Sequence, residues 1–502
     1  MQREVDRLEA HAQDVRSGGF TDVVLLGMGG SSLGPEVIRQ VIGVTPGFPR
    51  FRALDSIDPD DVRDAMAQAP TSLFIIASKS GSTIEPNVMA AEARRRVESA
   101  GHRWGSRCVA ITDEGTALHQ LARAERFREI FLNPADIGGR YSVLSFFGLV
   151  PAALMGVSVS RFLEHAVAMS QECRDADTHA NPGVALGALL GAAAEAGRDK
   201  LMLTLPGRLA SMGLWIEQLI AESTGKSGKG IVPVRDEPGT SAIGSDRVEV
   251  TVRLGEANRA TARRSNETTV PGASMEMADA STLGAEFFRW EMATATAGWL
   301  MGINPFDEPN VQQAKEATRE LLVAYSREGQ LPARLPHATS DGVHFTLSEA
   351  AVRIKSAIEP SALLSMVRAG DYFALLAYLP SSDEAFARTM DRFRTAAAAR
   401  TGVATTLGYG PRYLHSTGQL HKGGPNTGVF LIVTAEPSED LLIPAEPYTF
   451  GILERAQALG DFDSLDKLGR RALLMELPDR HSRTLDRALS SLLSADGQHA
   501  SP

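Results

Sequence analysis

The first half of the chain alternates short apolar runs with segments of helical periodicity. Runs of strand length lie at 21–27, 51–55, 72–78 and 107–113. A helical pattern lies at about 3–16, a Gly-rich turn followed by a helix at 28–43, and a second helical pattern at about 84–99. Apolar runs of this length are typical of buried strands, and strands separated by helices predict a parallel sheet with right-handed crossovers.

The same alternation resumes near residue 200. Strand-like runs lie at 200–206, 230–234, 247–254, 371–380, 403–408 and 428–436, and helical patterns at about 208–224, 283–301 and 383–400. Residues 255–282 are polar without a regular pattern, so we expect them to be irregular. We expect a helical insertion at about 310–370, a second sheet continuing beyond it, and a short helix followed by a disordered tail after 480.

These patterns predict an α/β protein with two parallel-sheet subdomains, helices on both sheet faces, a helical insertion and C-terminal helices. The expected units are residues 1–160, residues 161–480 including the insertion, and residues 481–502.

One uncharged stretch, residues 141–160, has the length of a membrane span. Several serines and Pro151 dilute it, and no second such stretch accompanies it. We therefore expect a buried core helix and no contact with a membrane. The N-terminus is charged and amphipathic, which is unlike a signal peptide.

Composition narrows the class of ligand. The chain has 502 residues and a net charge of −10, so its overall field does not attract nucleic acid, and an anionic ligand needs a local site. The only cysteines are Cys108 and Cys173, which form no disulfide framework and no CxxC pair. We expect a reducing, cytoplasmic location. With no convincing cluster of metal ligands, we expect no metal and no cofactor.

A glycine-rich turn follows the first apolar run. Residues 27–35 read GMGGSSLGP. Glycines allow close backbone approach, the next helix presents free N–H groups, and Ser31 and Ser32 add hydroxyls. The spacing fits neither a P-loop nor a dinucleotide fingerprint. The turn is typical of a phosphate or sugar cradle, although a purely structural turn has the same composition.

A second polar turn follows the run at 72–78. Residues 78–86 read SKSGSTIEP, which places four hydroxyls and Lys79 within six residues. This density of short donors suits one phosphate monoester. Such turns also serve simply as helix caps. Two of them after apolar strands favour a ligand site.

Two charged residues stand in glycine-rich surroundings. Arg140 in IGGRYS could hold an anion or form an ordinary salt bridge. Glu222 in AESTGKSGKG ends a predicted helix, where the helix dipole disfavours a carboxylate. That makes Glu222 a candidate base with a raised pKa, although an exposed glutamate would give the same pattern.

Taken together and in order, these motifs resemble the glucose-6-phosphate isomerase family. The matching strings are GMGGSSLGP, SKSGSTIEP, GGRYS, ESTGK and INPFDEPNVQQAK (303–315), and the resemblance spans about residues 20–320. It implies a double sugar-isomerase (SIS) fold. The strings PGRLASMGLWIEQLIAESTGKSGKG and GPRYLHSTGQLHKGGP look most like the isomerase half of bifunctional transaldolase/glucose-6-phosphate isomerase fusions. We found no transaldolase-like half, so a link to a transaldolase is an expectation from resemblance alone.

The resemblance assigns a role to each matching residue. For substrate binding it implies sugar contacts from Gly30 and Ser31, phosphate contacts from Ser78, Lys79, Ser80 and Thr83, and positioning of the site by Glu85. For catalysis it implies Glu222 as the base that moves a proton between C2 and C1, Arg140 as stabiliser of the enediolate, and Lys315 as an aid to ring opening.

The chain departs from the family pattern in two places. Glu308, a residue that the resemblance places at the substrate, stands seven residues before Lys315, where the family usually has Gln, which leaves the local hydrogen-bond pattern open. The family's ring-opening histidine follows the base closely, but residues 237–250 contain none. The similar string occurs at 414–424, with His415 the better match and His421 the second. In the family this histidine comes from the other subunit, which implies a homodimer; the changed order leaves open which chain supplies it.

The resemblance implies reversible isomerisation of glucose 6-phosphate to fructose 6-phosphate through a cis-enediol. A non-catalytic SIS sugar-phosphate sensor and a dual phosphoglucose/phosphomannose isomerase are the alternatives. The joint presence of Glu222, Arg140 and Lys315 favours the enzyme.

Overall fold

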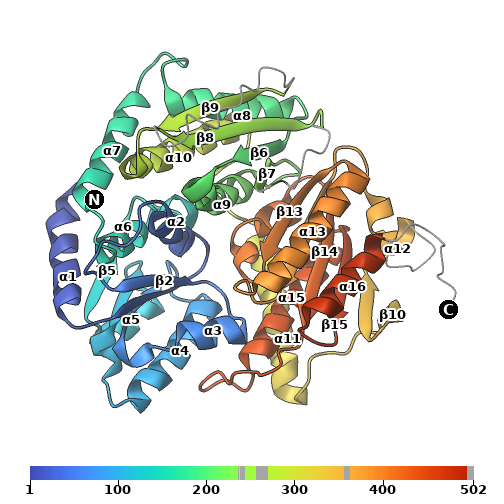
Figure 1. Ribbon diagram of the computed structural model, residues 1–502, viewed down its shortest axis with the longest axis horizontal. Coiled ribbons are helices and arrows are strands. Elements are labelled where there is room, and N and C mark those ends of the chain that lie inside the picture. The colour runs from blue at the N-terminus through green and yellow to red at the C-terminus, as the bar shows by residue number, and fades with distance from the viewer. Residues whose placement is uncertain (236, 238–243, 256–269, 355–361, 494–502) are drawn as a thin grey trace.

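The computed structural model describes residues 1–235, 237, 244–255, 270–354 and 362–493, with the backbone alone for residues 311–314 (Figure 1). The expected tail after residue 493 lies outside the described residues. Within them, no helix is long and apolar enough to cross a bilayer.

The N-terminal unit is a five-stranded parallel sheet of order β2-β1-β3-β4-β5. Its strands are β1 (Asp22–Gly27), β2 (Arg50–Leu54), β3 (Ser72–Ala77), β4 (Cys108–Thr112) and β5 (Glu129–Leu132). Its helices are α1 (Val5–Ser17), α2 (Leu33–Val41), α3 (Pro59–Ala65), α4 (Ile84–Ser99), α5 (Ala117–Ala124) and α6 (Phe146–Leu154). Every residue of β3 is buried, because helices cover both faces of the sheet. The predicted parallel α/β arrangement is confirmed here.

The uncharged stretch at 141–160 lies in the protein interior. It contains α6, all of whose residues are buried, and it contributes to the largest hydrophobic core. The expectation of a core helix is confirmed.

The middle unit is built around a four-stranded parallel sheet of order β7-β6-β8-β9. It comprises α7 (Val159–Glu172), α8 (Pro182–Glu195), β6 (Lys200–Thr204), α9 (Met212–Thr224), β7 (Val232–Arg235), β8 (Arg247–Leu254), β9 (Gly272–Met277) and α10 (Leu283–Leu300). The expectation that 255–282 is irregular was wrong for β9. This strand lies at the sheet edge and is only partly buried, so it lacks an apolar run. The rest of the expectation, at 256–269, falls outside the described residues.

The C-terminal unit is a six-stranded mixed sheet of order β10-β11-β15-β14-β12-β13. Its strands are β10 (Ala338–Ser340), β11 (Val343–Leu347), β12 (Tyr372–Tyr378), β13 (Ala404–Tyr409), β14 (Gly428–Ala435) and β15 (Arg471–Leu477). Its helices are α11 (Val311–Glu328), α12 (Glu349–Ile354), α13 (Glu384–Thr401), α14 (Gly418–Gly423), α15 (Phe450–Lys467) and α16 (Ser482–Leu493).

Two expectations for the second half need correction. Residues 310–370 are not a helical insertion throughout, because β10 and β11 form a hairpin that pairs antiparallel with β15. Between them, Asp341 and Gly342 both have positive φ, as a two-residue hairpin turn requires. The second half also holds two sheets where one continuous sheet was expected.

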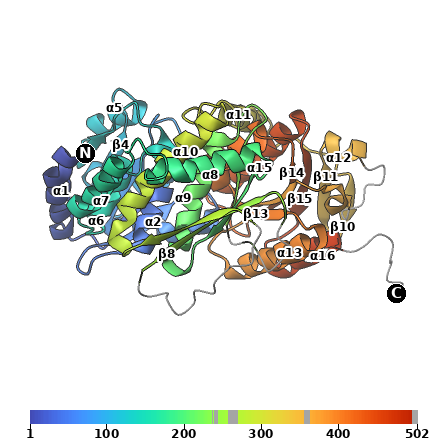
Figure 2. The same cartoon turned by 90° about the horizontal axis from the view of Figure 1, so that it is seen from above.

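The three units share their cores and meet around the C-terminal end of α9. One hydrophobic cluster joins the first sheet to Leu322 of α11 and Phe450 of α15. Another joins Ala221 of α9 to the C-terminal sheet. In the turned view, α9 of the middle unit and α11 of the C-terminal unit lie between the N-terminal sheet and the C-terminal sheet (Figure 2). Segments distant in sequence are therefore brought together at this junction.

Candidate active site

A cavity of about 950 Å³ lies at the junction of the three units. All twelve residues singled out from the sequence line it: Gly30, Ser31, Ser78, Lys79, Ser80, Thr83, Glu85, Arg140, Glu222, Glu308, Lys315 and His415. The first seven follow β1 and β3, at the carboxyl ends of parallel strands, where open α/β sheets place their ligands.

The glycine-rich turn after β1 is locked against a second turn. Gly29–Ser31 forms a short 3-10 turn in which Gly29 has φ +56°. A Cβ on Gly30 would lie 1.9 Å from the carbonyl oxygen of Gly139, which precedes Arg140. Only glycine at position 30 allows this approach, so the sequence at this turn sets the position of Arg140.

The turn after β3 presents hydroxyls and one cation to the cavity. Ser78 Oγ donates to Thr83 Oγ1 at 3.2 Å, and the hydroxyls of Ser80 and Ser82 lie 3.0 Å apart. Lys79 Nζ donates to Asp113 Oδ2 at 2.5 Å and to the carbonyl oxygen of Ala135 at 2.7 Å. The N-terminus of α4 lies directly behind the turn. Hydroxyls, a lysine and free helix N–H groups together suit a phosphate dianion.

Glu85, in the first turn of α4, holds His415. Its side chain is buried, and its Oε1 lies 3.0 Å from His415 Nε2 and accepts from Gln457 Nε2 at 2.7 Å. Burial opposes ionisation of Glu85, yet the charge and hydrogen bond of His415 hold the pKa of its carboxyl below the usual value. An imidazole whose Nε2 proton faces a carboxylate keeps Nδ1 for proton exchange with a ligand.

His415 is also fixed through its backbone. It ends the short turn Arg412–His415, and Arg412 makes a bidentate ion pair with Asp55 at 2.7 and 2.9 Å. Asp55 follows β2, so the N-terminal sheet anchors a turn from the C-terminal unit. Gln218 Nε2 donates to the carbonyl oxygen of His415 at 2.8 Å.

Glu222 lies in the last turn of α9, facing the cavity. Its Oε2 accepts from Gln218 Nε2 at 3.0 Å, and its Oε1 lies 3.6 Å from Arg140 Nη1. Burial raises the pKa of the Glu222 carboxyl; Arg140 opposes the rise and the nearby Glu308 carboxylate adds to it. A carboxylate with a raised pKa is a better base near neutral pH.

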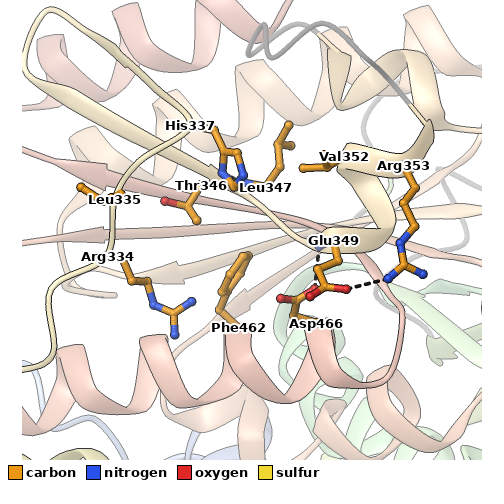
Figure 3. Close-up of a pocket in the computed structure, with 10 residues that line it drawn as sticks. All are labelled: Arg334, Leu335, His337, Thr346, Leu347, Glu349, Val352, Arg353, Phe462 and Asp466. Carbon is orange, nitrogen blue, oxygen red and sulfur yellow. Dashed lines mark hydrogen bonds and ion pairs between the residues drawn. The ribbon is translucent and has the colours of Figure 1, made fainter.

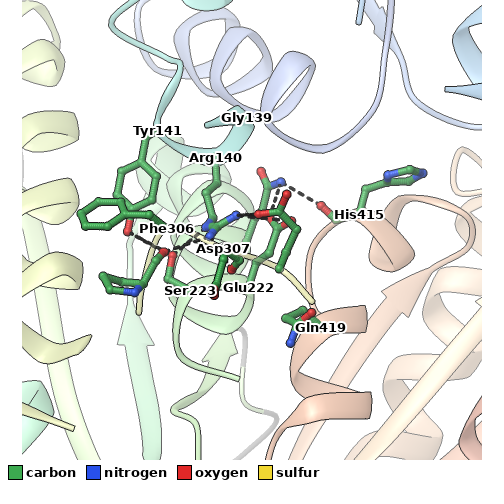
Figure 4. Close-up of polar contacts among 12 residues, drawn as sticks. Gly139, Arg140, Tyr141, Glu222, Ser223, Phe306, Asp307, His415 and Gln419 are labelled. Atoms are coloured by element: carbon green, nitrogen blue, oxygen red, sulfur yellow. Dashed lines mark hydrogen bonds and ion pairs between the residues drawn. The ribbon is translucent and has the colours of Figure 1, made fainter. Parts of the chain in front are cut away.

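Arg140 is almost completely buried beside Glu222 (Figure 4). Its partners are Ser223 Oγ (to Nε, 2.8 Å), Glu308 Oε2 (to Nη1, 2.9 Å) and the carbonyl oxygens of Pro305 and Asp307 (to Nη2, both 2.9 Å). A guanidinium held in this way is a preorganised positive charge for an oxyanion formed next to Glu222.

His421, the second candidate histidine, does not line the cavity among the described residues. Its ring packs against Tyr372, Tyr413 and Phe430 at centroid distances of 5.1–6.3 Å. Burial drives the pKa of His421 well below its usual value, and Lys422 adds to the effect. His421 is thus a neutral core residue, and His415 is the histidine at the site.

The structure adds residues that we did not predict. Gln218 lies four residues before Glu222, on the same face of α9, and that spacing was a readable signal. Asp113 follows β4 and reaches Lys79. Gln457 lies in the middle of α15 and carries no sequence signal that points to this site.

A smaller cavity of about 400 Å³ lies in the C-terminal unit, between β11 and α15 (Figure 3). It contains none of the twelve predicted residues. Its charged side chains are already paired within the protein, as Arg353 is with Glu349 and Arg334 with Asp463. We therefore place the candidate active site in the larger cavity.

Comparisons with known proteins agree with this placement. A family model described as phosphoglucose isomerase matches residues 2–234, a range that includes Glu222 and the two polar turns. A glucose-6-phosphate isomerase of Synechococcus sp. (strain CC9902) is 29% identical over 400 residues, 69% of this chain and 74% of that protein. A glucose-6-phosphate isomerase of Prochlorococcus marinus is 36% identical over 213 residues, 41% of this chain and 40% of that protein.

Solved structures show the same fold. The crystal structure of a glucose-6-phosphate isomerase from Chlamydia trachomatis superposes with a TM-score of 0.56 at 21% identity, covering 64% of this chain and 74% of that chain. A hypothetical protein of Thermus thermophilus gives a TM-score of 0.55 at 22% identity, covering 64% of this chain and 88% of that chain. The link to a transaldolase stays a prediction.

Proposed function

We propose that this chain, which belongs to the glucose-6-phosphate isomerase family, interconverts glucose 6-phosphate and fructose 6-phosphate. The observation that carries the proposal is the shared cavity of the Glu222 carboxylate and the hydroxyl-rich turn at 78–83. One end of the cavity suits a phosphate dianion and the other holds a buried base beside a buried cation.

The phosphate acts as a handle. Hydroxyls of the turn after β3, Lys79 and the N-terminus of α4 bind it, and this binding energy orients the reacting carbons at the other end of the cavity. Ring opening comes next. His415 and Lys315 share the two proton movements, one to the ring oxygen and one from the anomeric hydroxyl.

Isomerisation is a proton transfer between adjacent carbons. In the direction from glucose 6-phosphate, Glu222 takes the proton from C2, the C1 carbonyl becomes the enediolate oxygen, and Arg140 offsets its charge. Glu222 then returns the proton to C1, and the proton of the C2 hydroxyl passes to the adjacent C1 oxygen, which gives the ketose with a C2 carbonyl and a C1 hydroxyl. General acid–base catalysis of this kind contributes about 10²–10⁴-fold.

One chain supplies the complete site in this proposal. His415 contacts Glu85, and its carbonyl oxygen contacts Gln218, all within the same polypeptide. We therefore propose that His415 acts in its own chain. The expected homodimer stays a prediction. A cytoplasmic location is proposed as well, since it fits a phosphorylated hexose substrate.

The decisive experiment is Glu222→Gln assayed with fructose 6-phosphate in a coupled assay. We expect turnover to be lost, because an amide cannot accept the carbon-bound proton, while calorimetry shows that 6-phosphogluconate still binds. Glu195→Gln, an exposed change on α8, is the matched control. Retained turnover in Glu222→Gln would exclude Glu222 as the base. A wild-type chain that binds sugar phosphate without turnover would favour the sensor alternative.

A further inference from the structure

Among the described residues, the N–H groups of Arg140 already face acceptors within the protein. A guanidinium has five N–H groups. Among the described contacts, Ser223 takes the Nε proton, two backbone carbonyls take both Nη2 protons, and Glu308 takes one of the two Nη1 protons. The remaining N–H is on Nη1, which also forms an ion pair with Glu222 Oε1 at 3.6 Å, so a ligand oxygen reaches Nη1 only in competition with a carboxylate.

The partners of Arg140 differ in how easily they can leave. The carbonyls of Pro305 and Asp307 belong to a loop that Lys226 fixes, donating to the carbonyl oxygens of Asn304 and Asp307 and to Asp307 Oδ1. Ser223 lies within α9 and is fully buried. The Glu308 side chain is 48% exposed, and Glu308 follows Asp307 in the same loop. Glu308 is therefore the partner that a ligand can displace at least cost.

Glu308 also changes the charge at the reacting end of the cavity. The groups that act on Glu222 are Arg140 from the turn after β5, Glu308 from the loop before α11, Gln218 from its own helix and His415 from the C-terminal unit. Arg140 is thus shared by two carboxylates before the reaction creates a third negative charge.

We propose that Glu308 competes with the enediolate oxygen for Nη1 of Arg140, so that substrate must displace a carboxylate already bound there. This inference rests on the proposed isomerase reaction. Glu308 is a positioning residue here: it acts through Arg140 and not on the reacting carbons. Its negative charge keeps Glu222 more basic, at the cost of weaker binding to anionic states of the substrate.

Glu308→Gln tests the competition, because it keeps the side-chain shape and an acceptor oxygen but removes the charge. A neutral amide oxygen binds the Arg140 guanidinium more weakly than a carboxylate does, because the Coulomb attraction between opposite charges is lost. We expect calorimetry to show 6-phosphogluconate, whose carboxylate resembles the enediolate, binding roughly two- to fivefold more tightly than to the wild type. Inorganic phosphate, which needs only the turn at 78–83, should bind with unchanged affinity. The acidic limb of the kcat/KM–pH profile should move to lower pH.

Glu316→Gln, an exposed change of the same type on α11, is the matched control and should alter none of these quantities. Unchanged 6-phosphogluconate affinity in Glu308→Gln would overturn the competition. An equal gain for phosphate and 6-phosphogluconate would also overturn it, because that pattern reports a general change of charge. Failure of the proposed function is separate: it would appear as absent turnover in the wild type, while the two affinities still test the competition at Arg140.

Discussion

At the scale of single residues, the buried carboxyl of Glu222 makes the folded state less stable when it is ionised. Its carboxyl is buried and has a raised pKa, so the folded chain binds this proton more tightly than the unfolded chain does. The folded state therefore loses stability as pH rises from the unfolded pKa, about 4.3, through the folded one.

It follows that Glu222→Gln should melt at a higher temperature than the wild type at about pH 8, and that the difference should vanish near pH 4, where both side chains are neutral. Scanning calorimetry across this range checks the prediction. A variant that melts below the wild type at the higher pH would contradict it.

Lys79 offers a second test at this scale. Because its ammonium is already bound to Asp113 and a carbonyl oxygen, it is held at the phosphate end of the cavity. Lys79→Met should raise KM for fructose 6-phosphate by about 10- to 100-fold, the loss of one charge-assisted hydrogen bond, with a smaller change in kcat. Steady-state kinetics measure the split, with the exposed Lys467→Met as control. A fall in kcat at constant KM would place Lys79 in the chemical step instead.

The sequence identified residues better than it identified their partners. All twelve predicted residues line one cavity. Their motifs either follow strands of a parallel sheet or lie next to a motif that follows such a strand. The contact of Glu85 with His415 joins positions 330 apart, and that with Gln457 positions 372 apart. Neither follows from local patterns, since only the packing of two units brings these side chains together.

At the scale of elements, the docking of the turn Gly29–Ser31 on the turn Gly139–Tyr141 sets the position of Arg140 relative to Gly30 and Ser31. Gly30→Ala would put a methyl group inside contact distance of the Gly139 carbonyl oxygen. The turns must separate, and Arg140 moves with one of them. We expect a loss of kcat/KM of at least about 100-fold, the scale on which small misplacements act. Gly19→Ala and Gly139→Ala are controls that separate a steric clash from backbone strain. Neither added Cβ meets a neighbour, and of the two positions only Gly19 has a positive φ. Near-normal turnover in Gly30→Ala would show that the contact is not needed.

Elements with a strong local pattern were predicted well and edge elements were not. The strands β1, β3 and β4 are buried apolar runs, and α4 was predicted with its observed bounds. The strands β9, β10 and β11 lie at or next to sheet edges, and β9 and β10 are only partly buried, so they lack the continuous apolar run that marks a central strand. The Asp341–Gly342 pair was a readable hairpin signal that we did not use.

At the scale of the whole molecule, a buried ion cluster joins the first and last units. Arg480, which follows β15, contacts Asp58 at the N-cap of α3 at 2.5 Å and Glu454 of α15 at 2.9 Å. All three side chains are at most 5% exposed. Removing one member of such a cluster leaves uncompensated buried charge.

Arg480→Met should therefore reduce the free energy of unfolding by about 3–5 kcal/mol. Denaturant titration measures this, with Arg388→Met, an exposed ion pair on α13, expected to change it by less than about 1 kcal/mol. Equal effects of the two changes would show that the cluster does not hold the units together.

The described residues that line the cavity run from Met28 to Gln457 of one polypeptide. Ribosomes deliver a chain from its amino end, so the phosphate turns and the base emerge long before the imidazole and the glutamine that completes its anchor. A nascent chain can therefore fold its first sheet while translation continues, but its active site stays incomplete until Gln457 has been synthesised.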